Sequence, residues 1–146
     1  MQILRVLILA AMAAAAPWQR PAPEVMAVKR VVDGNMIELT GYGRVRLAGI
    51  HAPRLGQRGG DGQPFARESR DRLDGIVTHR FVRLEFPPRP ATGAFVLLED
   101  GTFVNALLVG EGLARVTGHP SGARGEALMR AEAQAREAGR GIWRAR

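Results

Sequence analysis

Two neighbouring stretches decide the fold: VVDGNMIEL at residues 31–39 and RVRLAGIHAPR at residues 44–54. In the first stretch, Ile37 and Leu39 alternate with more polar neighbours, which is the pattern of a strand with one buried face. Gly41-Tyr42-Gly43 lies between the stretches and is typical of a hairpin turn. Pro53 ends the second strand, because proline cannot donate to a strand ladder. The two stretches therefore predict a tight β-hairpin that leads into a polar corner.

The rest of the chain continues this alternation between short strands and helices. Strands are predicted at residues 25–32, 36–40, 44–49, 81–86 and 94–99, and helices at residues 64–77, 103–111 and 124–138. In the third strand, Ala48 is expected to share the polar face with Arg44 and Arg46, and Pro64 is expected at or near the first turn of the first helix. The Gly-rich segment 55–63 is predicted to be a mobile loop. This order predicts an α+β fold that is mainly β: a five-stranded OB-fold barrel with about three packed helices.

The two stretches resemble the signature of staphylococcal nuclease-like (thermonuclease-like) domains, V-D-G-D-T-I followed by R-L-x-G-I-D-A-P-E. Further matches follow in order: LEDGTFVN at residues 98–105, LLV at 107–109, EGLARV at 111–116 and EAQAREAGRGIW at 132–143. The resemblance covers residues 28–143. Most matching residues are expected to have structural roles. Gly34 and Gly101 are expected at positive φ, Asn105 is expected to bond backbone groups near the short helix, and Trp143 is expected to pack the last segment onto the barrel.

The resemblance implies a phosphodiesterase site with one Ca²⁺, a Glu and two arginines. The first arginine corresponds to Arg46, which is the retained candidate for a catalytic role. Other residues occupy the remaining positions: Asn35 and His51 at two metal-binding Asp positions, Arg54 at the Glu position and Ala91 at the second-arginine position. Arg89 lies two residues before Ala91, but the prolines on both sides of Arg89 argue against a regular strand that would present its side chain.

These replacements predict a degenerate site. Arg54 cannot act as a general base, because its guanidinium stays protonated. Asn35 and His51 form a weak ligand set for calcium, which prefers several carboxylates, so no metal is predicted. Asp33 matches a family acid beside the metal; the alternatives are that it caps the turn at Gly34 or joins His51 in a transition-metal pair. Residues 117–120 lack the family's base-stacking tyrosines.

A basic composition suggests an anionic partner. The chain has 146 residues and a formal net charge of +7, and Lys29 is the single lysine among its 21 basic residues. Such a surface suits polyanions, although a general compositional bias toward arginine is the alternative. The candidate anion-binding residues are Arg44, Arg46, Arg54, Arg58 and Arg89, and His79 and His119 are expected at the surface. Three functions stay open. The first is a degenerate domain that binds nucleic acid, another phosphate or an acidic ligand. The second is an active nuclease with a rearranged site, and the third is a protein-interaction module.

The first 16 residues have the pattern of a signal peptide. Arg5 supplies a positive n-region, an apolar run follows from Val6, and A-x-A cleavage signals end it. The alternative is an uncleaved membrane anchor, but the run is shorter than the roughly 20 residues that span a bilayer. We expect a periplasmic or secreted protein with no stable membrane insertion after cleavage, a Pro-rich linker at residues 17–24 and a nuclease-like domain at 25–146. The absence of cysteine excludes disulfides and thiolate metal sites.

Overall fold

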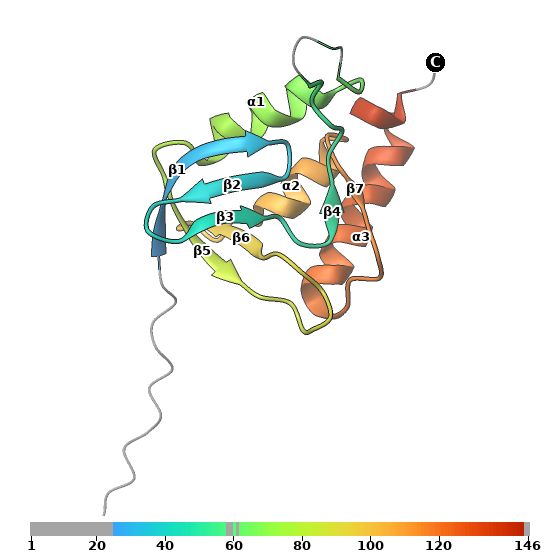
Figure 1. The fold of residues 1–146 in the computed structure, drawn as a ribbon. Coiled ribbons are helices and arrows are strands. Elements are labelled where there is room, and N and C mark those ends of the chain that lie inside the picture. Colours follow the sequence, from blue (N-terminus) through green and yellow to red (C-terminus); the bar gives the residue numbers. More distant parts are fainter. Residues whose placement is uncertain (1–24, 58–59, 61, 145–146) are drawn as a thin grey trace, which may run out of the picture.

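The computed structural model describes residues 25–57, 60 and 62–144. The expected leader at residues 1–16, the expected linker at residues 17–24 and Arg58 lie outside the described residues. Of the expected domain at residues 25–146, the structure describes all but residues 58–59, 61 and 145–146 (Figure 1).

The centre of the fold is a five-stranded antiparallel sheet with the order β3-β2-β1-β5-β6. Its strands are β1 (Val25–Asp33), β2 (Met36–Leu39), β3 (Gly43–Arg46), β5 (Phe81–Glu85) and β6 (Phe95–Leu98). The two edge strands meet at a parallel bridge between Leu47, after β3, and Ala94, before β6. The Ala94 N–H donates to the Arg46 carbonyl at 2.9 Å, and the Ala48 N–H donates to the Ala94 carbonyl at 2.8 Å. The prediction of a mainly β fold built on five strands is therefore confirmed.

The predicted third strand is wrong in its extent, because the chain bends after Arg46. A separate two-stranded sheet pairs β4 (Ile50–His51) with β7 (Arg115–Val116), which the sequence did not predict. Gly49 lies between β3 and β4 with φ +72, a conformation that favours glycine. Ala48 is 2% exposed instead of sharing the polar face of Arg44 and Arg46, because the bend turns it into the core. The bend thus carries His51 away from the main sheet.

Three helices cover the sheet: α1 (Ala66–Val77), α2 (Val104–Gly110) and α3 (Gly122–Glu137), followed by a short 3₁₀ turn η1 (Gly141–Trp143). Helix α1 packs on β1, while α2 contacts both β6 and α3 and lies between them (Figure 1). Helix α1 begins two residues later than predicted, because Phe65 adopts φ 68, so Pro64 lies just before the first turn. None of the helices in the described part of the chain is long and apolar enough to cross a membrane.

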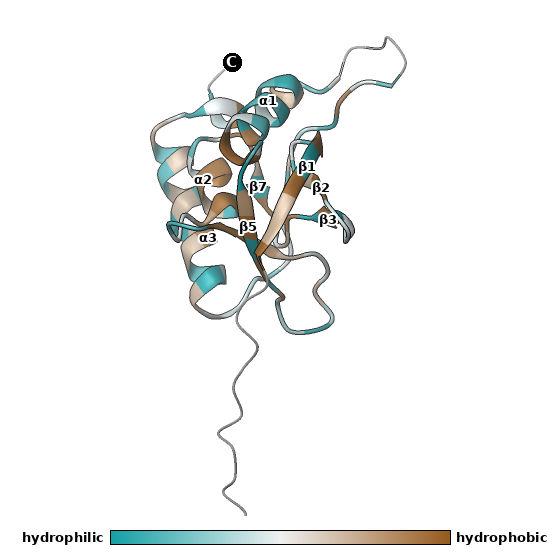
Figure 2. Ribbon diagram, turned by 90° about the vertical axis from the view of Figure 1, so that its left-hand side faces the viewer, coloured by the Kyte–Doolittle hydropathy of each residue, from teal (hydrophilic) through white to brown (hydrophobic). Residues whose placement is uncertain are grey.

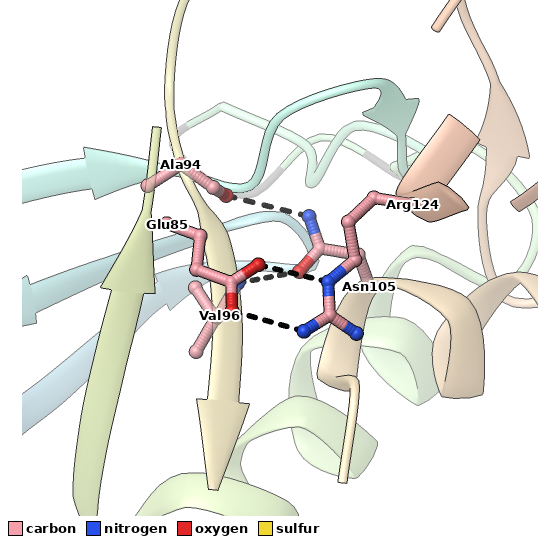
Figure 3. Close-up of polar contacts among 5 residues, drawn as sticks. All are labelled: Glu85, Ala94, Val96, Asn105 and Arg124. Carbon is pink, nitrogen blue, oxygen red and sulfur yellow. Dashed lines mark hydrogen bonds and ion pairs between the residues drawn. The ribbon is translucent and has the colours of Figure 1, made fainter. Parts of the chain in front are cut away.

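The core lies between the sheet and the helices, and Figure 2 shows the hydrophobic residues gathered on the strands and on α2. The expected inward residues Ile37 and Leu39 are buried, as are Leu73, Ile76 and Val77 of α1. One polar residue within this core is Asn105, at the start of α2 (Figure 3). Its Oδ1 accepts a hydrogen bond from the Val96 N–H at 2.9 Å, and its Nδ2 donates to the Ala48 carbonyl at 2.9 Å. The predicted backbone-bonding role of Asn105 is confirmed, and its partners belong to β6 and to the bend before β4.

Candidate functional site

A groove of about 600 Å³ opens where β1, β3 and β4 end; we call it the β1–β4 groove. Its lining residues are Val32, Asp33, Asn35, Arg46, His51, Ala52, Pro53, Arg54 and Leu55. Four of the residues singled out in the sequence, Asn35, Arg46, His51 and Arg54, therefore lie around one groove. Asn35 lies in the turn between β1 and β2, and Arg46 is the last residue of β3. His51 belongs to β4 and Arg54 follows it, so the chain leaves the main sheet at the bend but still contributes to the lining of the groove.

Asn35 connects the segments that line the groove by hydrogen bonds. It is only 4% exposed, and its Nδ2 donates a hydrogen bond to the Ile50 carbonyl of β4 at 3.2 Å. Its backbone carbonyl accepts from the Leu47 N–H at 2.8 Å. A carboxylate cannot make the first of these bonds, because it has no proton to donate at neutral pH. At this position an amide thus connects the β1–β2 turn to β4, the strand that carries His51.

Asp33 caps the same turn. Its Oδ1 accepts a hydrogen bond from the Asn35 N–H at 2.9 Å, which is the capping role left open in the sequence. The expectation for Gly34 is wrong, because Gly34 is not among the glycines with positive φ. A Cβ atom there would lie 2.7 Å from the Cβ of Ala52 and 2.8 Å from the Cβ of Ser69. Glycine is needed because the turn packs directly against the segment after β4 and against α1. The expected positive φ of Gly101 is confirmed at 86°.

The groove is rich in positive charge. Arg46 and Arg54 are exposed at its border, His51 is half-buried, and Asp33 is the one carboxylate among the described residues that line the groove. Within the described residues, no ion pair engages Arg46 or Arg54. By contrast, Glu38 pairs with both Lys29 and Arg30, at 2.9 Å and 2.6 Å. The two arginines of the groove therefore differ from Lys29 and Arg30, whose charge Glu38 compensates.

The backbone of Arg54 is fixed at the mouth of the Gly-rich loop. Its N–H donates to the Gln63 Oε1 at 2.7 Å, and the Gln63 N–H donates back to the Arg54 carbonyl at 2.9 Å. This two-way pairing closes the base of the loop between Arg54 and Gln63. Arg54 thus starts from a fixed backbone position although its side chain is exposed.

The residues present do not fit a calcium ion. The Asn35 side-chain N–H group is directed to the Ile50 carbonyl, Asp33 accepts a backbone hydrogen bond, and two arginines border the groove. Calcium prefers six to eight oxygen ligands, several of them carboxylates. Within the part of the chain that the structure describes, no three His, Asp or Glu side chains form a group that could hold a metal ion.

Three of the candidate residues lie elsewhere. Ala91 and Arg89 line a separate hollow of about 430 Å³, which is bordered by the prolines of residues 87–90 and by residues 117–121. Arg44 is exposed on β3 opposite Glu38 and is absent from the lining of the groove. His79 and His119 are exposed, as expected. An arginine restored at position 91 would therefore start from a different hollow than Arg46.

A network of charged and aromatic side chains connects β7, the strand paired with β4, to the C-terminal segment. The sequence motifs do not place this network at the site. His51 pairs with Arg115 on β7, and the guanidinium of Arg115 lies 5.4 Å from the ring centroid of Trp143. The guanidinium of Arg136 lies 4.1 Å from the same centroid. Glu132 accepts a hydrogen bond from the Val116 N–H at 2.8 Å, which ties β7 to α3. Trp143 thus packs the last segment onto β7 and α3.

Comparison with known proteins agrees with this geometry. The model of the family described as staphylococcal nuclease homologue matches residues 44–145. The matched region contains Arg46, His51 and Arg54, whereas Asp33 and Asn35 precede it. A comparison with curated proteins found no matching sequence. Because the matched region spans well over half of the chain and includes β3, β4 and all three helices, this protein belongs to the family of staphylococcal nuclease homologues.

Proposed function

We propose that this domain binds nucleic acid in the β1–β4 groove and does not hydrolyse it efficiently. Family membership points to a nuclease-type or nucleic-acid-binding function. The observation that carries the proposal is the gathering of Arg46, His51 and Arg54 around a single carboxylate, Asp33, which is already hydrogen-bonded to the backbone. The groove is thus suited to an anion in a family whose ancestral site is suited to a metal.

Phosphate is the anion that this chemistry favours. A guanidinium donates two parallel hydrogen bonds to phosphate oxygens, and such charge-assisted bonds are stronger than neutral ones. Arg46 and Arg54 are exposed and engage no carboxylate among the described residues, so their binding requires no ion pair to be broken. The net charge of +7 adds a long-range attraction for polyanions.

Efficient hydrolysis is not supported by the same residues. Arg54 occupies the position of the general base and cannot accept a proton. Loss of a general base costs about 10²–10⁴ in rate, and loss of one charge-stabilising donor costs about 10²–10³. These factors do not simply multiply within one catalytic unit. Without the base, the second arginine and the metal carboxylates, Arg46 alone provides only electrostatic stabilisation.

The fold itself is compatible with this function. We propose that the bridge between Leu47 and Ala94 closes the sheet into an OB-type barrel. Barrels of this type bind oligonucleotides on a strand face and its neighbouring loops, and the β1–β4 groove lies at such strand ends. We also propose that residues 1–16 direct export to the periplasm or outside the cell, because their sequence has the charge and cleavage pattern of a signal peptide.

Fluorescence anisotropy of labelled single-stranded DNA, titrated with the full-length protein in low salt, tests the proposal. Arg46→Ala and Arg54→Ala should each weaken binding, and the slope of log affinity against log salt should fall by about 1 for each lost phosphate contact. Arg44→Ala is the matched control, because Arg44 lies two residues from Arg46 on β3 but does not line the groove. An equal effect of all three variants would contradict a localised site.

A nuclease assay on the same DNA, with Ca²⁺ or with a chelator, tests the second half of the proposal. We expect no metal-dependent cleavage above a buffer control. Robust cleavage that disappears in Arg46→Ala would instead establish an active nuclease with a rearranged site. Absence of binding even at low salt would overturn the proposal and favour a protein-interaction module.

A further inference from the structure

A second hollow, of about 640 Å³, opens on the other side of His51; we call it the C-terminal hollow. Its lining residues are His51, Pro53, Gln63, Pro64, Phe65, Arg115, Ile142 and Arg144. His51 and Pro53 line both this hollow and the β1–β4 groove. The two concave surfaces are therefore neighbours that share His51 and Pro53 as a common border.

The C-terminal hollow combines positive charge with apolar surface. Arg115 and Arg144 are exposed, and no carboxylate lines the hollow among the residues that the structure describes. Arg115 is held in place by its contact with the Trp143 ring, 5.4 Å from the centroid. Half-buried Phe65 and Ile142 provide an aromatic and an aliphatic surface beside these cations. Phe65 is fixed by its left-handed backbone, φ 68, directly before α1.

Single-stranded nucleic acid matches this combination. Its backbone repeats a negative charge at every nucleotide, and its bases are free to contact apolar and aromatic side chains. In a duplex the bases are stacked inside and only their edges are accessible. A simple inorganic anion or an acidic peptide would use the arginines but not the surface of Phe65 and Ile142.

We propose that the C-terminal hollow is a second nucleotide subsite, which binds the part of a single strand that extends beyond the β1–β4 groove. In this arrangement Arg46 and Arg54 bind one phosphate, His51 lies at the passage, and Arg115 and Arg144 bind a neighbouring phosphate while a base contacts Phe65 or Ile142. This inference rests on the proposed function, because it extends the strand bound in the groove.

The test compares a labelled dinucleotide with a labelled hexanucleotide of the same base, both titrated with the full-length protein. Affinity should rise with length. Arg144→Ala and Arg115→Ala should weaken hexanucleotide binding by about 5- to 10-fold, as expected for the loss of one charge-assisted contact at a partly solvated site. Arg144→Ala should weaken dinucleotide binding less than hexanucleotide binding. Arg46→Ala should weaken binding of both lengths. Double-stranded DNA of equal length should bind more weakly than the single strand.

Two controls separate the subsite from general effects. Arg130→Ala removes the same charge from α3 at a position that lines neither hollow, so it should change hexanucleotide binding less than Arg144→Ala does. Arg115→Ala also loses the contact with Trp143, so its melting temperature is measured, and Arg144→Ala decides the outcome if Arg115→Ala is unstable.

The outcomes distinguish the two proposals. If binding depends on Arg46 but is independent of length and of Arg144, the groove binds nucleic acid and the second subsite is refuted. If Arg144→Ala and Arg130→Ala have equal effects, the contribution is general charge, and the subsite is also refuted. If neither oligonucleotide binds, the proposed function itself fails.

Discussion

Replacing Asn35 by Asp introduces the carboxylate that the resemblance to nuclease-like domains implies at this position, and we expect this change to destabilise the protein. The Asn35 side chain is buried, 4% exposed, and donates to the Ile50 carbonyl at 3.2 Å. An ionised Asp cannot donate this hydrogen bond and places negative charge next to a carbonyl oxygen. Loss of the bond with a buried group left unsatisfied costs about 1–3 kcal/mol, and desolvation of the new carboxylate adds to this.

At neutral pH the free energy of unfolding should therefore fall by about 2–3 kcal/mol. This is the upper part of the range, because both effects act on one buried group. For a domain of this size, about 4 °C in melting temperature corresponds to 1 kcal/mol, so the melting temperature should fall by about 8–12 °C. The measurement is thermal unfolding followed by circular dichroism, with urea unfolding for the free energy.

The dependence on pH identifies the cause. Burial raises the pKa of the new carboxyl above the ordinary value of about 3.9 for Asp. A raised folded-state pKa means that the folded state holds its proton longer, so stability is lost as the pH rises from the unfolded-state pKa through the folded-state pKa. The difference in the free energy of unfolding between Asn35→Asp and the native protein should therefore be small near pH 4 and largest at neutral pH. Asn35→Ala, which loses the bond but adds no charge, should show a smaller deficit that does not change across this window.

One result would refute the reasoning: Asn35→Asp as stable as the native protein at neutral pH, in the presence of a chelator. Asn35 would then be exchangeable, and its hydrogen bond to Ile50 would not explain the amide at this position.

Three further predictions concern other parts of the fold. Millimolar Ca²⁺ should leave the melting temperature of the native protein unchanged, because a ligand that binds only the folded state would raise it; a rise of several degrees that disappears in Asn35→Ala would contradict this. Gly34→Ala should lower the free energy of unfolding by about 1–3 kcal/mol through overpacking, because its Cβ would lie 2.7 Å from the Cβ of Ala52. The control is Gly75→Ala inside α1, which has open space around it and should be neutral or stabilising in the same unfolding assay. The Arg124 guanidinium donates two hydrogen bonds to the Glu85 carboxylate, at 2.9 Å and 3.0 Å, and holds the pKa of Glu85 below its usual value (Figure 3). The pair therefore stabilises the fold fully above the ordinary Glu pKa, and this stabilisation is lost as the pH falls through the lowered pKa. Glu85→Gln should accordingly cost only about 0.5 kcal/mol at neutral pH, because both side chains are partly exposed, and this cost should shrink as the pH falls through the lowered pKa of Glu85. Glu126→Gln, whose Arg130 partner is 3.7 Å away, should have no measurable effect over the same range.

The main sheet was predictable because its signal is local. The alternation of Ile37 and Leu39 with polar neighbours and the turn at residues 41–43 fix the first hairpin within a short stretch. The β4–β7 pair was missed because His51 meets Arg115 far along the chain, and two-residue strands have no periodicity to detect. The late start of α1 was missed because the left-handed backbone of Phe65 is unusual for a residue with a bulky side chain.

The composition of the site was more predictable than its geometry. The family spacing places Asn35, Arg46, His51 and Arg54 together, and the groove contains all four. Spacing alone does not show that the Asn35 amide points to Ile50 or that the backbone of Arg54 pairs with Gln63. The family spacing also aligns Ala91 with the second site arginine of the family, while the structure places Ala91 in the hollow beside residues 87–90. Such differences depend on long-range packing, which a motif does not describe.

The replacements in the groove form a consistent physical change. In a site built from several carboxylates, mutual repulsion opposes folding unless a cation is bound. Here the same framework is held by direct bonds: Asn35 to the Ile50 carbonyl, and Asp33 to the Asn35 N–H. These bonds connect the turn directly to β4, and Arg46 and Arg54 engage no ion pair among the described residues. We therefore propose that the groove keeps its shape without a metal and that its permanent positive charge binds phosphate without efficient cleavage.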